Sequence, residues 1–319
     1  MDSTFVQYIN GKIKKKFSEY NHSVIFGQNI VSGSRISGLG AGLDQIDNCL
    51  ALNTINSENS LVGLGFGLSL CEIPSMFLMK QHDFALLGLD QLVNTYNVLR
   101  NGRMRAPFVI LMPIVDSGFE GPQSSLSSLD EFASLTRAPV LLLSSRESID
   151  KAFKESSKPG LYLMALSQKN MKKICSPSEV ENIDFDEAII QKHIAHKETG
   201  VIAVVSFGVD LSIAIEVTER LNNERYSVNL VNLTKLSRVN LNSRLFMELA
   251  NYDEFIILDS GKSEIHFSSD LVLKLREMGK YVDLYQRTPS QKWSEVNVDQ
   301  NEFTADDIVG RIMKGRDIV

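Results

Sequence analysis

Apolar and polar positions follow one another along the chain in a way that predicts short buried strands separated by amphipathic helices. Over residues 3–20, apolar side chains recur every fourth residue from Phe5 to Phe17, which predicts an opening helix. The lysines among residues 12–16 are expected to lie on its solvated side. Residues 107–112, Pro-Phe-Val-Ile-Leu-Met, are apolar throughout, as expected for a strand of a parallel sheet that is buried on both faces.

The same pattern continues on both sides of a polar stretch at residues 167–198, which has no sustained apolar period and is the predicted linker. Strands that alternate with helices indicate parallel sheets covered by helices. We therefore predict an α/β protein with two domains, residues 1–166 and 199–319, each built on a mainly parallel sheet. The predicted strands are 23–28, 74–79, 107–112, 139–143, 161–165, 201–206, 227–233, 254–258 and 281–285, and the predicted helices are 58–70, 84–100, 128–135, 147–155, 211–222, 241–251, 267–278 and 304–314.

Composition narrows the classes of protein that fit this pattern. The 319 residues are 43% hydrophobic and 23% charged, which is typical of a globular protein with room for two cores. A net charge of −6 argues against nucleic acid or an anionic membrane as the main partner. The three cysteines form no CxxC, and no run of apolar residues is long enough to span a bilayer. The first residues lack the apolar core of a secretory signal, so the expected location is the cytoplasm.

One carboxylate, Glu58, stands at the start of an apolar, glycine-rich helix. Helix N-termini favour carboxylates, which is the simplest explanation for it. A carboxylate that leads into such a helix also risks burial, and a buried charge needs a partner. The glycines of this helix, Gly63, Gly65 and Gly67, cost roughly 1 kcal/mol each in a helix interior, which favours a role in close packing.

Several common catalytic motifs are missing from the sequence. The glycines at 63–67 and at 38–42 do not satisfy G-x-G-x-x-G, and the sequence contains neither a phosphate-binding Walker A loop nor a G-x-S-x-G nucleophile motif. The histidines form no HExxH. His193 and His196 are three residues apart and could ligate a metal, but an exposed pair is the favoured interpretation.

Two further segments extend the pattern that begins at Glu58. After an intervening strand comes Gln81-His-Asp-Phe84-Ala-Leu-Leu-Gly-Leu-Asp-Gln-Leu-Val-Asn94, and later Gly121-Pro122. In order and spacing this resembles the pyrimidine-binding half of thiamine-diphosphate enzymes, especially the C-terminal half of transketolase and the β-subunits of 2-oxo acid dehydrogenase E1 components. In that family a glutamate opens a glycine-rich helix, and a strand and a "DF…DQ(I/L)xN" segment follow. The resemblance covers most of the chain.

The resemblance implies roles for two residues. Glu58 would hydrogen-bond N1′ of the aminopyrimidine ring of thiamine diphosphate and activate the cofactor, and Phe84 would stack against that ring. The chemistry would make or break a carbon–carbon bond next to a carbonyl, on a 2-oxo acid or a ketose-like substrate. Plain core packing is the alternative for Phe84.

The sequence departs from the family's pattern on the substrate side. The position of the family's loop histidine is occupied by Ser124, and Gln28 stands where many E1 β-subunits have a glutamate. His82 could supply a proton from another direction, although an ordinary exposed or hydrogen-bonded histidine is the simpler interpretation. The loops 28–42 and 116–125 would line the substrate entrance. These departures favour transketolase-like transfer or 2-oxo acid decarboxylation and ligation over E1 dehydrogenase chemistry.

The family's metal motif is also missing, because the sequence contains no Gly-Asp-Gly. We therefore expect no metal ligands in this chain and expect an α-like partner subunit to hold Mg²⁺ and the cofactor's diphosphate in an α2β2 assembly. Three alternatives remain open: the E1 β-subunit of a 2-oxo acid dehydrogenase complex, a non-catalytic transketolase-like scaffold subunit, and an unrelated two-domain α/β protein.

Overall fold

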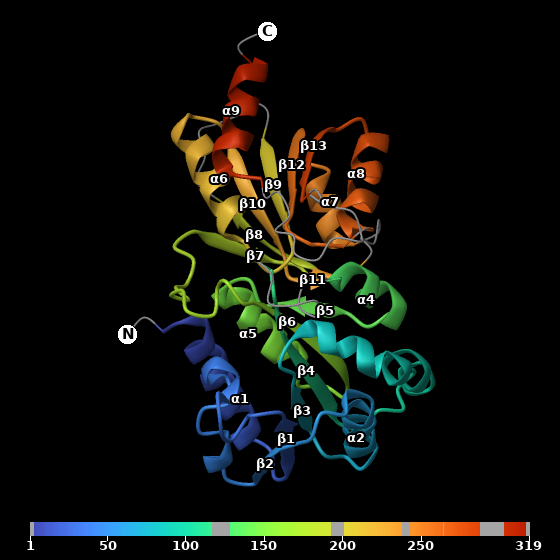
Figure 1. The fold of residues 1–319 in the computed structure, drawn as a ribbon. Helices are drawn as coiled ribbons and strands as arrows, with labels where there is room; N and C mark the ends of the chain where they lie inside the picture. The colour runs from blue at the N-terminus through green and yellow to red at the C-terminus, as the bar shows by residue number, and fades with distance from the viewer. Residues whose placement is uncertain are drawn as a thin grey trace, which may run out of the picture. The chain divides into compact units, whose positions relative to one another are not determined.

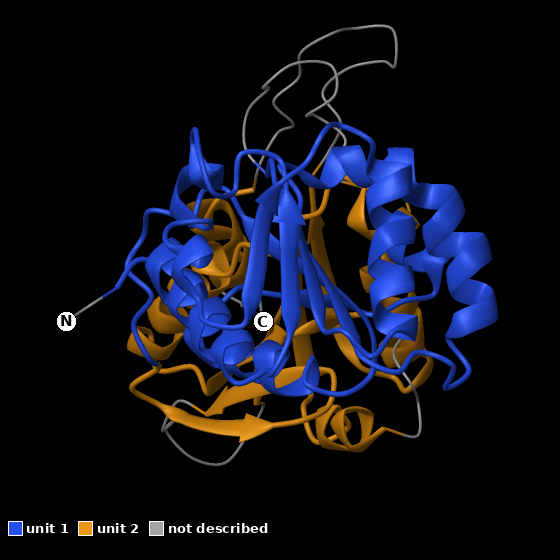
Figure 2. Cartoon of the chain, turned by 90° about the horizontal axis from the view of Figure 1, so that it is seen from below, with its two compact units in different colours: residues 1–127, 132–177 blue, residues 128–131, 178–319 orange. Residues whose placement is uncertain are grey.

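The chain forms two compact units (Figure 1). The computed structural model describes residues 3–116, 128–192, 201–237, 243–263, 265–287 and 303–316. The first unit comprises residues 1–127 and 132–177, and the second comprises residues 128–131 and 178–319. Figure 2 draws the first unit in blue and the second in orange. Ser124, His193 and His196 lie outside the described residues.

A parallel sheet forms the centre of the first unit, with its strands in the order β5-β6-β4-β3-β1-β2. The elements in chain order are α1 (Phe5–Ser18), β1 (Ser23–Gly27), η1 (Arg35–Gly38), η2 (Leu43–Gln45), β2 (Cys49–Asn53), α2 (Glu58–Leu70), β3 (Ser75–Leu78), η3 (His82–Gly88), η4 (Gln91–Thr95), α3 (Tyr96–Leu99), β4 (Pro107–Ile114), α4 (Leu129–Thr136), β5 (Val140–Leu142), α5 (Arg146–Glu155) and β6 (Gly160–Ser167).

The second unit contains a six-stranded sheet in the order β13-β12-β9-β10-β8-β7. Strands β13, β12, β9 and β10 are parallel, while β8 and β7 run antiparallel to their neighbours. The elements are β7 (Glu181–Asp184), β8 (Ala188–Lys192), β9 (Ile202–Phe207), α6 (Ser212–Asn223), β10 (Val228–Leu233), β11 (Lys235–Leu236), α7 (Arg244–Leu249), β12 (Glu254–Asp259), α8 (Phe267–Glu277), β13 (Tyr281–Gln286) and α9 (Ala305–Arg316). The predicted fold class, α/β with two mainly parallel sheets, is confirmed.

Two segments differ from the pattern that their sequence predicts. The stretch 167–198, predicted as a linker, contains strands β7 and β8. These strands gain their stability from antiparallel pairing with each other and with β10, and a local apolar period does not report such pairing. The predicted helix 84–100 is divided into a 3₁₀ turn, a π turn and a short α-helix.

The two faces of the first sheet bury different side chains, because successive residues of a strand point to opposite sides. Ile25 and Val109 belong to the cluster that includes the apolar face of α1, and this cluster also contains residues of α5. Their neighbours Phe26 and Phe108 have their ring centroids 6.4 Å apart, and Phe108 meets Phe66 of α2 edge-on at 5.5 Å. Helices therefore cover both faces, with α1 and α5 on one side and α2 on the other (Figure 1).

Helix α2 lies so close to β4 that only glycine fits at the contact. A Cβ atom at Gly65 would overlap the ring of Phe108. At Gly63 the nearest atoms to such a Cβ belong to Gln91, 3.7 Å away, and at Gly67 no atom lies within 4 Å. The predicted packing role is thus confirmed for Gly65, whereas Gly67 serves no packing contact among the described residues.

One lysine of the opening helix is buried. Lys16 donates from its Nζ to the carbonyl oxygen of Phe153 and to the hydroxyls of Ser156 and Ser157, at 2.8, 2.9 and 3.1 Å. Burial lowers its pKa from 10.5 to about 8. The expectation that every lysine of this run lies on the solvated side was wrong for Lys16, because its ammonium group satisfies the C-terminal end of α5.

Within the described residues, no helix has both the length and the apolar character that crossing a bilayer requires.

A pair of glycine substitutions tests the packing of α2. We expect Gly65→Ala to lower the free energy of unfolding by about 1–3 kcal/mol, because the new methyl group overlaps a buried ring. Gly67→Ala introduces the same atom where nothing opposes it and should raise the free energy of unfolding by up to about 1 kcal/mol through helix propensity. Urea denaturation of both variants measures the difference, and equal effects would contradict the proposed contact.

Candidate functional site

Three predicted site segments follow the carboxyl ends of neighbouring strands. Strands β2, β1 and β3 are adjacent and parallel, so their carboxyl ends share one edge of the sheet. Gln28 follows β1, Glu58 opens the helix after β2, and His82 opens the turn after β3. Ligands of open α/β sheets bind outside the carboxyl ends of the strands, which makes this edge the candidate site.

Glu58 is buried, with 6% of its surface exposed, and it begins α2. The amide Nε2 of Gln28 donates a hydrogen bond of 3.4 Å to its Oε1. The buried carboxylate of Glu58 is therefore stabilised by a neutral amide from the loop after β1 and by the N-terminus of α2. Gln28 itself is only partly buried, and its described contact is with the carboxylate.

Phe84 lies on η3, which packs against the first turn of α2. A Cβ atom at Gly88, the last residue of η3, would lie 3.4 Å from the backbone oxygen of Glu58 and 2.8 Å from Val62. The ring of Phe84 is partly exposed and does not belong to the buried core, in contrast to Phe66. The structure thus brings the segment of Phe84 next to Glu58 and leaves part of the ring accessible.

His82 occupies a different environment from Phe84. It is buried, with 1% of its surface exposed, and its ring meets Phe132 edge-on at a centroid distance of 5.1 Å. Such packing suits a histidine of the core, and its part in proton transfer stays a prediction.

Two side chains at the same edge of the sheet were not singled out from the sequence. Asn53, the last residue of β2, accepts hydrogen bonds from the backbone N–H groups of Ile30 and Val31 at 2.7 and 3.1 Å. Asp116 follows β4 and is buried, where its Oδ2 accepts a hydrogen bond of 2.5 Å from the hydroxyl of Ser167. In the sequence, the signal that could have identified Asn53 and Asp116 is a polar residue at the end of an apolar strand.

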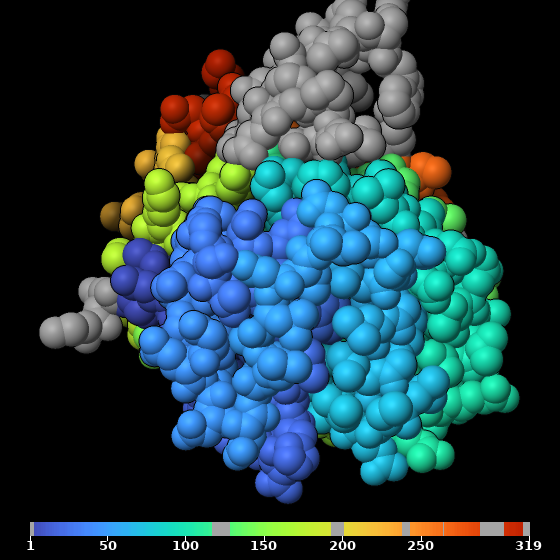
Figure 3. Space-filling view, turned by 60° about the horizontal axis from the view of Figure 1, so that its bottom comes forward, coloured from blue at the N-terminus to red at the C-terminus, as the bar shows by residue number. Residues whose placement is uncertain are grey.

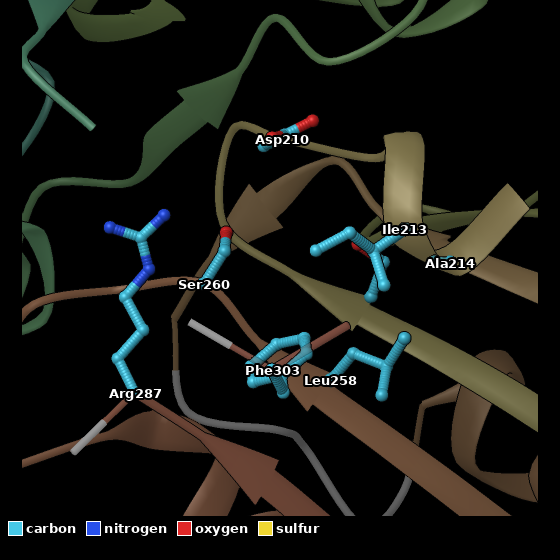
Figure 4. Close-up of a pocket in the computed structure, with 8 residues that line it drawn as sticks. Asp210, Ile213, Ala214, Leu258, Ser260, Arg287 and Phe303 are labelled. Carbon is cyan, nitrogen blue, oxygen red and sulfur yellow. The ribbon is translucent and has the colours of Figure 1, made fainter. Parts of the chain in front are cut away.

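Among the described residues, no group of three His, Cys, Asp or Glu side chains is arranged to hold a metal. A cavity in the second unit lies at the carboxyl ends of β9 and β12, with Arg287, Ser260 and Phe303 in its wall (Figure 4). Its volume is about 10 Å³, room for roughly one water molecule, so it is too small for an organic ligand.

Comparison with known proteins gives matches in structure. Neither a protein-family model nor a curated protein matches the sequence. A chain described as split-gene transketolase, inactive β4 tetramer, is similar with a TM-score of 0.69 and 13% identity, over 98% of both chains. Transketolase from Campylobacter jejuni subsp. jejuni is similar with a TM-score of 0.68 and 11% identity, over 98% of this chain and 47% of that one.

The chain spans about half the length of the Campylobacter protein and nearly the whole of the split-gene chain. At these identities the likeness concerns the fold. The two units, with their helix-covered sheets, therefore have the transketolase C-terminal-like fold that the sequence predicts.

Proposed function

We propose that this chain is the pyrimidine-binding, β-like subunit of a two-chain thiamine-diphosphate-dependent enzyme. The enzyme would make or break a carbon–carbon bond next to a carbonyl, by transketolase-like transfer or by decarboxylation or ligation of a 2-oxo acid. The observation that carries the proposal is the buried carboxylate of Glu58 at the start of α2. The segment η3, which contains Phe84, packs against this first turn of α2 through Gly88. The fold of the structural neighbours supports it.

The residues present fit the pyrimidine end of the cofactor. The carboxyl group of Glu58 would form a hydrogen bond with the ring atom N1′ and control its proton. Gln28 would orient Glu58 through the hydrogen bond between their side chains. The accessible part of the Phe84 ring would give the pyrimidine a flat apolar surface. When bound, thiamine diphosphate supplies the electron sink that the carbonyl chemistry needs.

In this proposal, the loops 28–42 and 116–125 line the entrance for the substrate. A 2-oxo acid or a ketose-like donor would enter beside Gln28, with Ser124 and His82 as the candidate polar groups. Because the described contact of Gln28 is with Glu58, we assign Gln28 to positioning the carboxylate. This assignment favours transfer or decarboxylation chemistry over that of an E1 β-subunit, in which many chains carry a glutamate at that position.

The outer side of α2 supports the need for a partner subunit. Leu64 of α2 and Leu87 of η3 are 43% and 62% exposed, and Gly67 of α2 is exposed as well. Helix α2, coloured light blue, lies on the surface facing the viewer in Figure 3. An exposed apolar surface of this kind suits contact with another chain. Further exposed apolar side chains of this region are Ile55, Leu70, Leu86 and Val98.

We infer that an α-like subunit covers this surface, holds Mg²⁺ and the diphosphate, and completes an α2β2 assembly. The missing Gly-Asp-Gly motif agrees with such a division of the site. One structural neighbour is a split-gene transketolase described as an inactive β4 tetramer, which agrees with a chain that needs another subunit for activity. A non-catalytic scaffold does not need the carboxylate of Glu58. Substitution of Glu58 therefore distinguishes a catalytic subunit from a scaffold subunit.

Glu58→Gln tests the catalytic role. In the complex co-expressed with its α-like partner, we expect turnover of a 2-oxo acid or ketose donor to fall by roughly 10²–10⁴-fold, because the amide cannot control the proton at N1′. Glu72→Gln is the matched control, since Glu72 is an exposed carboxylate just beyond the other end of the same helix. Unchanged turnover of Glu58→Gln in steady-state assays would contradict the mechanism.

Calorimetry tests the divided cofactor site. Titration of thiamine diphosphate with Mg²⁺ into the chain alone should give weak or undetectable binding, because the residues that hold the metal and diphosphate belong to the partner. The same titration into the co-expressed complex should give saturable binding. Binding by the isolated chain with the affinity of the complex would exclude a divided site.

A charged substitution on the outer side of α2 tests the assembly. Leu64→Glu should weaken association with the α-like partner by at least about tenfold, because the interface would bury an unpaired carboxylate. Leu273→Glu, at an exposed leucine of α8 in the second unit, controls for the added charge. Analytical ultracentrifugation of the mixed chains measures both; assembly of the Leu64 variant at the affinity of the control would place the interface elsewhere.

A further inference from the structure

Two buried carboxylates and a largely buried histidine meet in the second unit. They are Asp130 in the first turn of α4, Asp259 at the end of β12, and His266 just before α8. All three surround Gly261. A Cβ atom on that glycine would lie 3.0 Å from Oδ1 of Asp259, 3.5 Å from Oδ2 of Asp130 and 3.5 Å from Nδ1 of His266.

Asp130 caps a helix that lies far from it in the sequence. Its Oδ1 accepts a hydrogen bond of 2.9 Å from the backbone N–H of Phe267, the first residue of α8. His266, at the N-cap position of α8, makes no capping hydrogen bond with its own side chain. The backbone N–H of Asp130 also donates a hydrogen bond of 3.3 Å to the hydroxyl of Ser263. Residues 128–131 belong to the second unit, and there Asp130 contacts the N-terminus of α8 through its carboxylate and Ser263 through its backbone N–H.

The other two side chains form a pair. Oδ2 of Asp259 lies 3.0 Å from Nδ1 of His266, and Oδ1 of Asp259 accepts a hydrogen bond of 2.9 Å from the backbone N–H of Gly261. Asp130 is therefore a second carboxylate beside a pair that already contains one. Two carboxylates that share a buried site disfavour each other's ionisation.

The protonation of this cluster is shifted accordingly. Burial, and next the charge of Asp259, raise the pKa of Asp130 from 3.8 to about 6, against the opposing effects of the Phe267 N–H, His266 and Ser263. Burial acts to lower the pKa of His266, but the hydrogen bond and charge of Asp259, with Asp130 and Glu131, raise it above its ordinary value. Among the described residues between Asp259 and His266, Lys262 is the charged side chain, and it is also buried.

We propose that Asp130, Asp259 and His266 form a pH-dependent latch, which holds the first turn of α4 on the N-terminus of α8 and loosens as the pH rises. A neutral Asp130 carboxyl can stay buried beside Asp259 and still cap the helix through its carbonyl oxygen. An ionised Asp130 is repelled by Asp259 and gains hydration when the turn of α4 moves into water.

The direction follows from linkage between protonation and attachment. The pKa of Asp130 is about 6 when the turn is attached and 3.8 in water, so the attached state binds the proton more tightly. Attachment is therefore strongest below pH 4, weakens as the pH rises through 6, and is weakest above about pH 7. The raised pKa of His266 acts in the same direction at slightly higher pH. A shift of about two pKa units corresponds to a change of roughly a hundredfold in the equilibrium constant.

Hydrogen exchange at the Phe267 amide tests the latch, because this N–H donates to Asp130. In the wild-type chain, the protection factor, corrected for the intrinsic pH dependence of exchange, should fall by roughly tenfold between pH 5 and pH 7.5, since the pKa of Asp130 is about 6 when the turn is attached. Asp130→Asn keeps an acceptor oxygen but cannot ionise, so its protection should stay high, with only the smaller contribution of His266 above pH 6.5. Neither the cofactor nor a partner chain enters this test, so it is independent of the proposed function.

A control and a second variant complete the experiment. Asp270→Asn removes another carboxylate from the first turn of α8, which pairs with Lys274, and should keep the pH dependence of the wild type. If Asp130→Asn does not fold, His266→Gln serves in its place. Loss of the imidazolium charge should raise the pKa of Asp130 further and move the fall in protection to higher pH. Protection of wild-type Phe267 that does not depend on pH, an equal dependence in Asp130→Asn, or an unmoved transition in His266→Gln would overturn the proposal.

Discussion

The contact between α2 and the ring of Phe108 determines where the candidate catalytic carboxylate lies. Because Gly65 has no side chain, the helix axis can approach β4 until its backbone meets the ring. Glu58 stands two turns earlier on the same rigid helix. The distance between the helix and the sheet at Gly65 therefore also determines how deeply the carboxylate of Glu58 is buried. The packing of η3 on the first turn of α2 then brings the segment of Phe84 to the same place. A site that needs a buried acid beside an accessible ring is thus built by one close approach of helix to sheet.

Much of this arrangement could be predicted from local pattern. Alternating strands and helices gave the fold class, and a carboxylate leading an apolar helix gave a buried Glu58, because both signals lie within a few consecutive residues. The structure departs from the prediction where a partner lies far away in the sequence. Lys16 has the spacing of a solvated face, yet its ammonium group meets Phe153, 137 residues later. Strands β7 and β8 in the predicted linker exist through pairing with each other and with β10.

The same reason explains why the cluster around Asp130 could not be found in the sequence. A carboxylate in the first turn of a predicted helix is ordinary, since it would favour the N-terminus of its own helix. In the structure, Asp130 serves the N-terminus of α8, and its neighbour is another carboxylate. Glu58 and Asp130 are both buried acids at helix N-termini, but their neighbouring groups differ. The neutral amide of Gln28 lies beside Glu58, whereas the carboxylate of Asp259 lies beside Asp130. The surroundings of a carboxylate, more than its burial, decide which chemistry it can perform.

The apolar outer side of α2 has a consequence for how the chain is produced in a cell. Under the proposed function, every copy made in excess of the α-like subunit keeps Leu64, Leu87 and their neighbours in water. Apolar surface of that kind promotes self-association. Balanced synthesis of the two subunits would then be a requirement of solubility as well as of activity.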